Sequence, residues 1–151
     1  MTIKTATQIS TVIDALKTEI MTNAATLGGI TAVYEKDEHP GVALENNEIP
    51  CAYVIPIVEG KGTADFTIGG AGSTIRHEFP ITIIAYYKAD DVNSFIATNR
   101  NYLFNMIDII EAKRNMGGYM IYKAEYEVGY YEVSGDIVHF WIVKLFGKLW
   151  Y

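Results

Sequence analysis

The sequence predicts an α+β protein: a mostly antiparallel sheet with a long C-terminal β-hairpin and two main helices packed on one face. Three observations lead to this class. Two segments are amphipathic at helical spacing, the strand candidates do not alternate regularly with them, and residues 119–151 form an unusually long hairpin pattern. A length of 151 residues fits a single domain over residues 1–151.

Two segments have the apolar periodicity of helices. Residues 7–25 place Ile9, Val12, Ile13, Leu16 and Ile20 on one face, and Gly28-Gly29 follows as a stop signal. Residues 91–114 repeat the pattern, with Asp90 or Asp91 as the N-cap and Gly117-Gly118 after the end. The apolar positions of this second helix are Val92, Ile96, Leu103, Ile107 and Ile110.

Three strands are expected between the helices, over residues 30–35, 51–58 and 77–87. Pro56 and Pro80 predict edge or bulge positions, because proline cannot donate to the ladder. Residues 35–50 are acidic and read as an exposed loop. Residues 59–74 contain five glycines and predict a long mobile loop that docks on a neighbouring protein. The residues assigned to this docking loop are Gly60, Phe66, Ile68, Gly70 and Gly72.

The C-terminal hairpin is the most informative feature. Two strands of about fifteen residues flank a turn at Ser134-Gly135-Asp136, whereas ordinary strands have about five or six residues. The second strand is apolar on both faces, and an exposed apolar surface of that size is atypical of a monomer. We therefore expect an oligomer or partner interface formed by Tyr126, Tyr130, Phe140, Trp141, Phe146 and Trp150.

Composition limits the function classes. The net charge of −6 disfavours nucleic-acid binding through clustered Lys and Arg, and we expect no measurable affinity for duplex DNA at physiological salt. Cys51 is the only cysteine, so no intrachain disulfide forms and a reducing compartment is expected. The first ten residues lack a signal-peptide core, and no apolar run is long enough for a transmembrane helix. The expectation is a soluble intracellular protein without membrane contact.

No catalytic, cofactor-binding or metal-binding residue is expected, and we predict that the chain is not an enzyme. Asp37, Glu38 and His39 are neighbours in an acidic loop, but no second ligand cluster supports them. His77 and His139 lie in strand candidates without an evident partner for general-base chemistry. The glycine-rich run at residues 69–73 does not open a helix, so it lacks a phosphate-binding N-terminus.

The order of elements resembles the tail terminator, or tail-completion, proteins of long-tailed bacteriophages. The matching parts are the N-terminal helix ATQISTVIDALKTEI, the strand pair around GKGTADFTIGGAG, the helix DDVNSFIATNRNYLFNMIDIIEAKR and the closing hairpin. The resemblance covers nearly the whole chain and rests on architecture. It implies a virion structural protein, assembled in the host cytoplasm, that forms a hexameric ring closing the tail tube and joining tail to neck or head.

The partners implied by this resemblance are further copies of the chain, the tail tube protein, neck or connector proteins and a tail sheath protein. DNA would pass through the lumen without tight binding. Two alternatives stay open from the sequence. One is a head-tail connector or neck (head-completion) protein, and the other is a small ligand-binding or enzymatic α+β domain with a pocket between sheet and helices.

Overall fold

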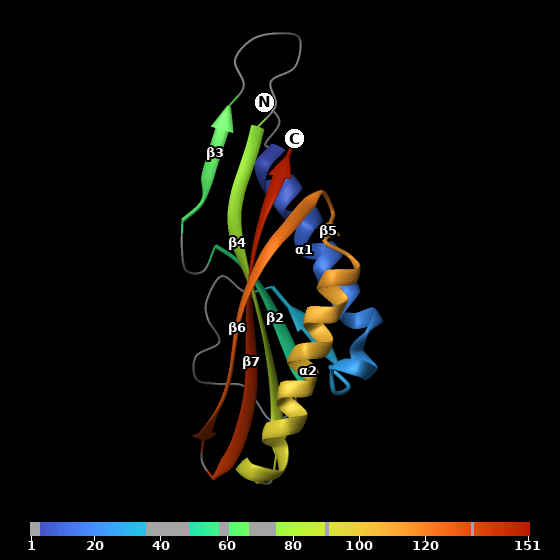
Figure 1. Cartoon of the computed structure of the whole chain (residues 1–151), viewed down its shortest axis with the longest axis vertical. Helices are drawn as coiled ribbons and strands as arrows, with labels where there is room; N and C mark the ends of the chain where they lie inside the picture. Colours follow the sequence, from blue (N-terminus) through green and yellow to red (C-terminus); the bar gives the residue numbers. More distant parts are fainter. Residues whose placement is uncertain (1–3, 36–48, 58–60, 67–74, 90, 134) are drawn as a thin grey trace.

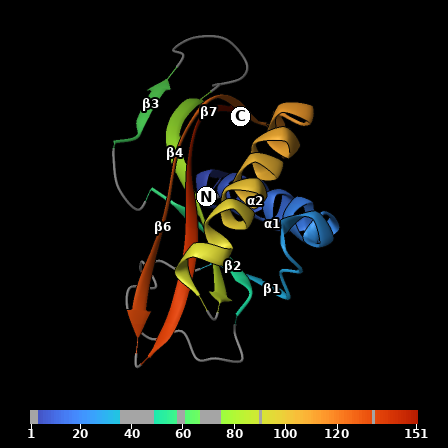
Figure 2. The ribbon, with the colours of Figure 1, turned by 60° about the horizontal axis from the view of Figure 1, so that its bottom comes forward.

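The computed structural model describes residues 4–35, 49–57, 61–66, 75–89, 91–133 and 135–151. Both α-helices lie on one side of a long curved sheet (Figures 1 and 2). The elements follow in the order α1 (Lys4–Thr22), the short 3₁₀ helix η1 (Ala24–Leu27), β1 (Ala32–Tyr34), β2 (Cys51–Pro56), β3 (Thr63–Phe66), β4 (Ile75–Ala89), α2 (Val92–Ala112), β5 (Asn115–Met116), β6 (Tyr119–Val133) and β7 (Asp136–Trp150).

The sheet confirms the predicted α+β class and adds one parallel pair. Its seven strands have the order β1-β2-β4-β7-β6-β5, and β3 pairs with β4 outside this path. The β1–β2 pair is parallel, and the other described pairs are antiparallel. The sheet is therefore mixed, although antiparallel pairing dominates.

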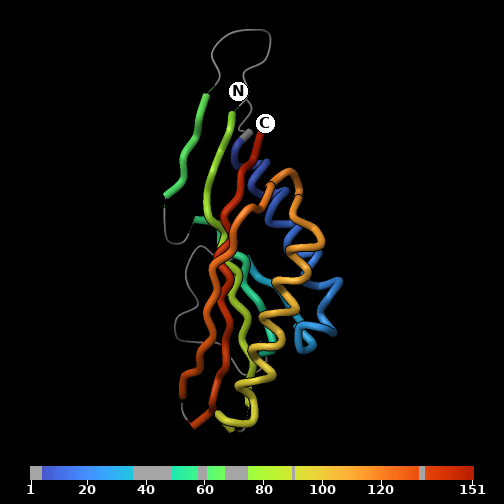
Figure 3. Tube along the Cα trace, in the orientation of Figure 1, coloured from blue at the N-terminus to red at the C-terminus, as the bar shows by residue number. Residues whose placement is uncertain are grey.

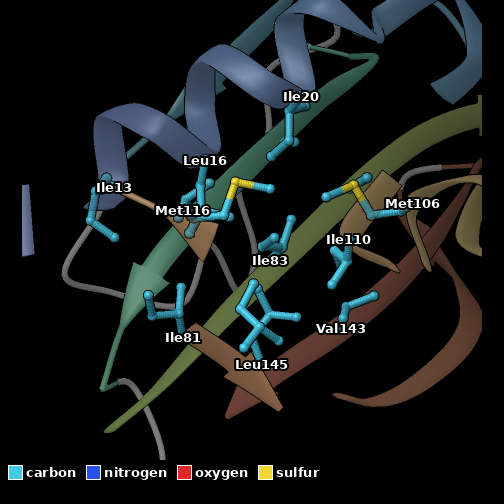
Figure 4. Packing of buried hydrophobic residues seen from close by; sticks show 14 of the residues in the cluster. Ile13, Leu16, Ile20, Ile81, Ile83, Met106, Ile110, Met116, Val143 and Leu145 are labelled. Carbon is cyan, nitrogen blue, oxygen red and sulfur yellow. The ribbon is translucent and has the colours of Figure 1, made fainter. Parts of the chain in front are cut away.

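The main core lies between the helices and one face of the sheet, which we call the helix face. Ile13, Leu16 and Ile20 of α1 point toward Ile81 and Ile83 of β4 (Figure 4). Leu103, Met106 and Ile110 of α2 join Trp141, Val143 and Leu145 of β7 in the same cluster. The stripe predicted for α1 supplies the side chains that hold this helix to the sheet. The stripe predicted for α2 is confirmed at Leu103 and Ile110, but Ile96 is 40% exposed.

The helix ends agree with the predictions to within a few residues. Asp91 is the N-cap of α2, where its carboxylate accepts a hydrogen bond from the Asn93 backbone N–H at 3.0 Å. The helix ends at Ala112, before the Gly117-Gly118 stop, because Asn115 and Met116 pair with β6 as strand β5. Gly117 and Gly118 both have positive φ and form the turn between these strands.

One expectation about the glycine-rich segment was wrong. Thr63–Phe66 form strand β3, antiparallel to the start of β4, instead of belonging to a loop. β4 is consequently longer than predicted, because residues 75–78 pair with β3 and residues 81–86 pair with β2. Pro80 lies between these two stretches, inside strand β4 and not in an edge strand. Neither β2 nor β3 pairs with it there, so the missing backbone N–H costs little.

The C-terminal hairpin forms with the predicted strands. β6 and β7 have 15 residues each, and Gly135 has the positive φ of 83° that a tight turn requires. Together with β4 they run along most of the length of the molecule (Figure 3). A register shift between Ile121 and Lys123 places a bulge at Tyr122. β7 lies between β4 and β6, so it is an interior strand with neighbours on both sides.

Candidate assembly surfaces

The hairpin residues expected at an interface divide into core and surface positions. Trp141 has no exposed surface, and its indole N–H donates to the Tyr87 hydroxyl at 3.0 Å within the main core. The expectation that Trp141 contacts a partner is therefore corrected: it is a core residue. Phe140 is half-buried beside Tyr86 and Tyr131 in a second cluster, on the sheet face opposite the helices.

Exposed apolar side chains gather where α2 meets strand β6. Tyr126, Val128 and Tyr130 alternate along β6 and are 57%, 44% and 54% exposed. Phe104 of α2 is 45% exposed and meets Tyr126 edge to face, with ring centroids 6.4 Å apart. We call these residues, with the exposed Ile96 of α2, the edge surface. Ile96, Phe104 and Val128 were not predicted as interface residues. The alternation of residues 125–130 was the signal that could have identified Val128.

The edge surface borders backbone that has no strand beside it in the described part of the chain. β5 pairs only with Tyr119 and Met120, so residues 123–133 of β6 have no partner strand on their outer side. The opposite edge of the sheet is formed by β1, which pairs only with β2, and by β3, which pairs only with β4. Of these two strands, β3 carries an exposed aromatic side chain, Phe66, which is 70% exposed.

A second surface lies on the opposite face of the sheet and combines cations with aromatic rings. Its aromatic members are Tyr122, Phe146 and Trp150, and its cations are Arg76, Lys123, Lys144 and Lys148. We call this set the opposite-face patch. Tyr122 and Trp150 are more than half exposed. Phe146 and Trp150, both predicted as interface residues, thus lie on the same exposed surface.

A pocket of about 340 Å³ adjoins this patch, lined by Lys61, Thr63, Glu78, Phe79, Pro80, Tyr122, Phe146 and Gly147. The Tyr122 hydroxyl donates to the Glu78 carboxylate at 2.6 Å, and this bond raises the pKa of Tyr122. The lining joins one carboxylate and one ammonium to apolar walls.

The predicted docking loop falls largely outside the described residues. Gly60, Ile68, Gly70 and Gly72 all lie there, and only Phe66 is placed, in strand β3. Asp37, Glu38 and His39 also lie outside the described residues. Within the described ranges, no three His, Cys, Asp or Glu side chains are grouped as metal ligands, and no helix is long and apolar enough to cross a membrane.

The two described histidines are in apolar surroundings. His139 is 1% exposed and its ring stacks against Phe95 and Tyr130, at centroid distances of 5.0 and 5.6 Å. Burial lowers the pKa of His139, and a hydrogen bond to the backbone of Asp91 opposes this shift. Burial also lowers the pKa of His77, which packs on Phe79. Neither ring is placed against a carboxylate, a thiol or a hydroxyl as a general base would be.

Comparisons with known proteins give a structural likeness but no match to the sequence. No family model matches the sequence, and no curated protein matches it. Among solved structures, a chain from the virion of a native gene transfer agent particle aligns with 97% of this chain and 99% of its own length. The TM-score is 0.39 and the sequence identity is 13%.

Proposed function

We propose that this chain is a non-enzymatic structural protein of a phage-type virion, a tail-terminator-like subunit that joins copies of itself edge to edge into a ring. The observation that carries the proposal is a pair of unlike strands, each open on one side and each with an exposed aromatic side chain: β6 with the edge surface and β3 with Phe66. The order of elements that resembles tail terminators, including the closing hairpin, supports the same assignment.

Ring closure requires two different surfaces on each subunit. In a head-to-tail contact, one patch of a subunit meets another patch of the next, and the chain closes when the rotation between neighbours divides a full turn. Pairing β6 of one copy with β3 of the next would satisfy the unpaired backbone groups of both strands, as in β-strand addition. A twofold dimer made from β6 alone would leave β3 unpaired.

The side chains on these edges favour association. Fully burying an exposed aromatic or aliphatic side chain contributes about 1.5–3 kcal/mol. Tyr126, Val128 and Tyr130 would supply this along β6, and Phe66 would supply it on β3. Natural proteins that stay monomeric protect such edges with charged side chains, especially lysine, with proline or with bulges. Residues 124–133 of β6 contain no lysine or proline, and their charged residues are Glu125, Glu127 and Glu132.

The finer assignments follow the resemblance. We propose a hexameric ring located at the end of the tail, in contact with the tube protein below and with neck or connector proteins above. DNA would pass through its lumen without being held. This role requires stable surfaces and no catalytic chemistry.

The proposal is tested by placing lysine on each edge separately. We expect the Tyr126→Lys/Tyr130→Lys variant and the Phe66→Lys variant to lose self-association in sedimentation velocity while remaining folded in thermal melts, since all three side chains are more than half exposed. Met21→Lys on α1, at a residue 42% exposed and distant from both edges in sequence, is the matched control and should assemble like the wild type.

Mixing the two defective variants separates a ring from a symmetric dimer. Each variant keeps one intact edge, so the mixture should form a heterodimer and nothing larger. Electron microscopy of the wild type should show closed particles with a central hole. A wild-type protein that stays monomeric at concentrations near 1 mM, corresponding to association weaker than about −4 kcal/mol, would contradict the proposal.

A further inference from the structure

We infer that the opposite-face patch docks an acidic, extended segment of a different protein. This inference rests on the proposed function only in that self-assembly occupies the β6 and β3 edges, which leaves the patch accessible in the assembled protein. It assigns to the patch a partner chemistry that edge pairing does not require.

Lysines and aromatic residues alternate along one face of strand β7. Lys144, Phe146, Lys148 and Trp150 are two residues apart in sequence, so their side chains all point to the face opposite the helices. The ammonium groups of Lys144 and Lys123 lie 5.5 and 5.0 Å from the centroid of the Phe146 ring. The Lys148 ammonium lies 5.5 Å from the Tyr122 ring. These cation–π contacts hold the lysines over the sheet.

Two of the cations have no carboxylate partner. Arg76 is paired with Asp65 at 2.5 Å, and Lys123 is paired with Glu125 at 3.0 Å. Lys144 and Lys148 form no ion pair with any carboxylate of the described residues, although Glu125 and Glu78 lie opposite them on the neighbouring strands. Their two ammonium groups are therefore available to carboxylates of a ligand.

The spacing of these two charges defines the ligand. Residues four apart on a strand are separated by about 13 Å, the distance between side chains at positions i and i+4 of another extended segment. Phe146 lies midway and borders the 340 Å³ pocket. A complementary segment therefore has two carboxylates that flank one apolar side chain, in the order acidic, any, apolar, any, acidic.

The carboxylates within the patch favour a protein over a nucleic acid. Glu78 is opposite Lys148 on β4, and Glu125 is opposite Lys144 on β6. A phosphate backbone carries a continuous row of negative charge, and some of its phosphates would lie close to these glutamates and be repelled by them. An acidic peptide can place single carboxylates on the lysines and neutral residues over the glutamates.

A second copy of this chain is a poorer occupant. Among the described residues, the apolar exposed surface that a second copy could offer is the edge surface, and the exposed Arg100 lies on α2 between Ile96 and Phe104. Docking that surface on the patch would bring a guanidinium toward two lysines. Like charges in contact across an interface oppose association. We therefore assign the patch to a separate acidic protein.

The test measures binding of a fluorescein-labelled peptide, Ser-Glu-Thr-Leu-Thr-Glu-Ser, by fluorescence anisotropy. The full-length wild type should bind it, and Lys144→Gln/Lys148→Gln should bind about tenfold more weakly because two ion pairs are lost. Lys17→Gln/Lys88→Gln changes the net charge equally at other surface positions and should bind like the wild type. A peptide with Gln in place of Glu should bind as weakly to the wild type as the acidic peptide binds to the patch variant.

Each of three binding results would overturn the inference, and a fourth result, from sedimentation, is given below: no binding by the wild type, equal binding by the wild type and the patch variant, or binding of a labelled DNA duplex in place of the peptide. Thermal melting of each variant establishes that it is folded. Sedimentation of the same variants distinguishes this inference from the proposed ring, because loss of self-association is expected from the edge variants alone. A patch variant that lost both peptide binding and self-association would make the patch a contact between copies and would also overturn the inference.

Discussion

Gly147 of β7 leaves room for the Tyr119 side chain of β6 to extend over β7 toward β4. Gly147 of β7 is buried under the Tyr119 ring, and a Cβ at this position would come within 2.5 Å of the ring and 2.8 Å of the Met120 carbonyl oxygen. The space lets the Tyr119 hydroxyl donate to the Phe79 carbonyl, which links β6 to β4 across β7. Because the ring is fully buried, it has no solvent-exposed position to move into.

We predict that Gly147→Ala lowers the free energy of unfolding by about 1–3 kcal/mol, the usual cost of overpacking a core. Gly129→Ala is the matched comparison, since its Cβ would meet only the outer ring atoms of the half-buried Phe140, which can rotate away. Urea unfolding of both variants measures the difference. Equal losses would show that the Tyr119 ring is not confined as described.

The buried His139 makes stability depend on pH. Its folded-state pKa is lowered by burial from 6.5, so the folded protein keeps the ring neutral while the unfolded chain protonates it near pH 6.5. The unfolded state therefore binds more protons below that pH, and stability falls as the pH decreases toward the folded-state pKa. His77, whose pKa is also lowered, acts in the same direction.

We predict that the free energy of unfolding of the wild type, and with it the melting temperature, falls between about pH 7.5 and about pH 5.5. The slope of the free energy is at most about 1.4 kcal/mol per pH unit for each proton involved. His139→Gln should be less stable at neutral pH but should lose less on acidification, because glutamine does not titrate. His77→Gln measures the second contribution. An unchanged pH profile in the His139 variant would exclude this residue as the source.

Among the elements, helix α2 depends on a local signal at its start. Asp91 caps the backbone N–H of Asn93, and no acidic residue is present in the first helical turn. Replacing an N-cap aspartate by alanine typically costs about 1 kcal/mol. The cap thus determines where α2 begins, immediately after the long strand β4.

We predict that Asp91→Ala destabilises the protein by about 1 kcal/mol, whereas Asp108→Ala, on the exposed side of the same helix, leaves stability nearly unchanged. Chemical unfolding followed by circular dichroism gives both values. If the two substitutions cost the same, capping by Asp91 does not contribute to stability.

At the scale of the whole molecule, the part of the sheet that forms the core differs from the parts that we propose contact partners. The middle of β7 is buried on the helix face by α1 and α2, and its other face contributes first to the second cluster and then to the opposite-face patch. The free edges of β6 and β3 are separate from both faces. This arrangement allows a ring to form through the edges while one face of every subunit stays accessible.

Much of this architecture was predictable from local pattern. The two helical stripes, the turn at Gly135 and the strand ends of the hairpin each depend on residues close in sequence, and the structure has them nearly where the pattern put them. The two-sided apolar character of residues 137–150 was also evident from the sequence. The reason for this two-sided apolar character was not evident, because an interior strand and an interface strand show the same pattern.

Only the tertiary structure decided which apolar residues are available to partners. Trp141 and Trp150 are equally hydrophobic, but the first is buried under the helices and the second is 55% exposed. The sequence by itself determined the two α-helices and the two strands of the hairpin, because helix and strand periodicity are local properties of the chain. The order of strands, the position of β3 beside β4 and the alignment of Lys144 with Phe146 and Tyr122 depend on pairing between distant segments. Such pairing is selected by burial of the whole sheet, and no local pattern encodes it.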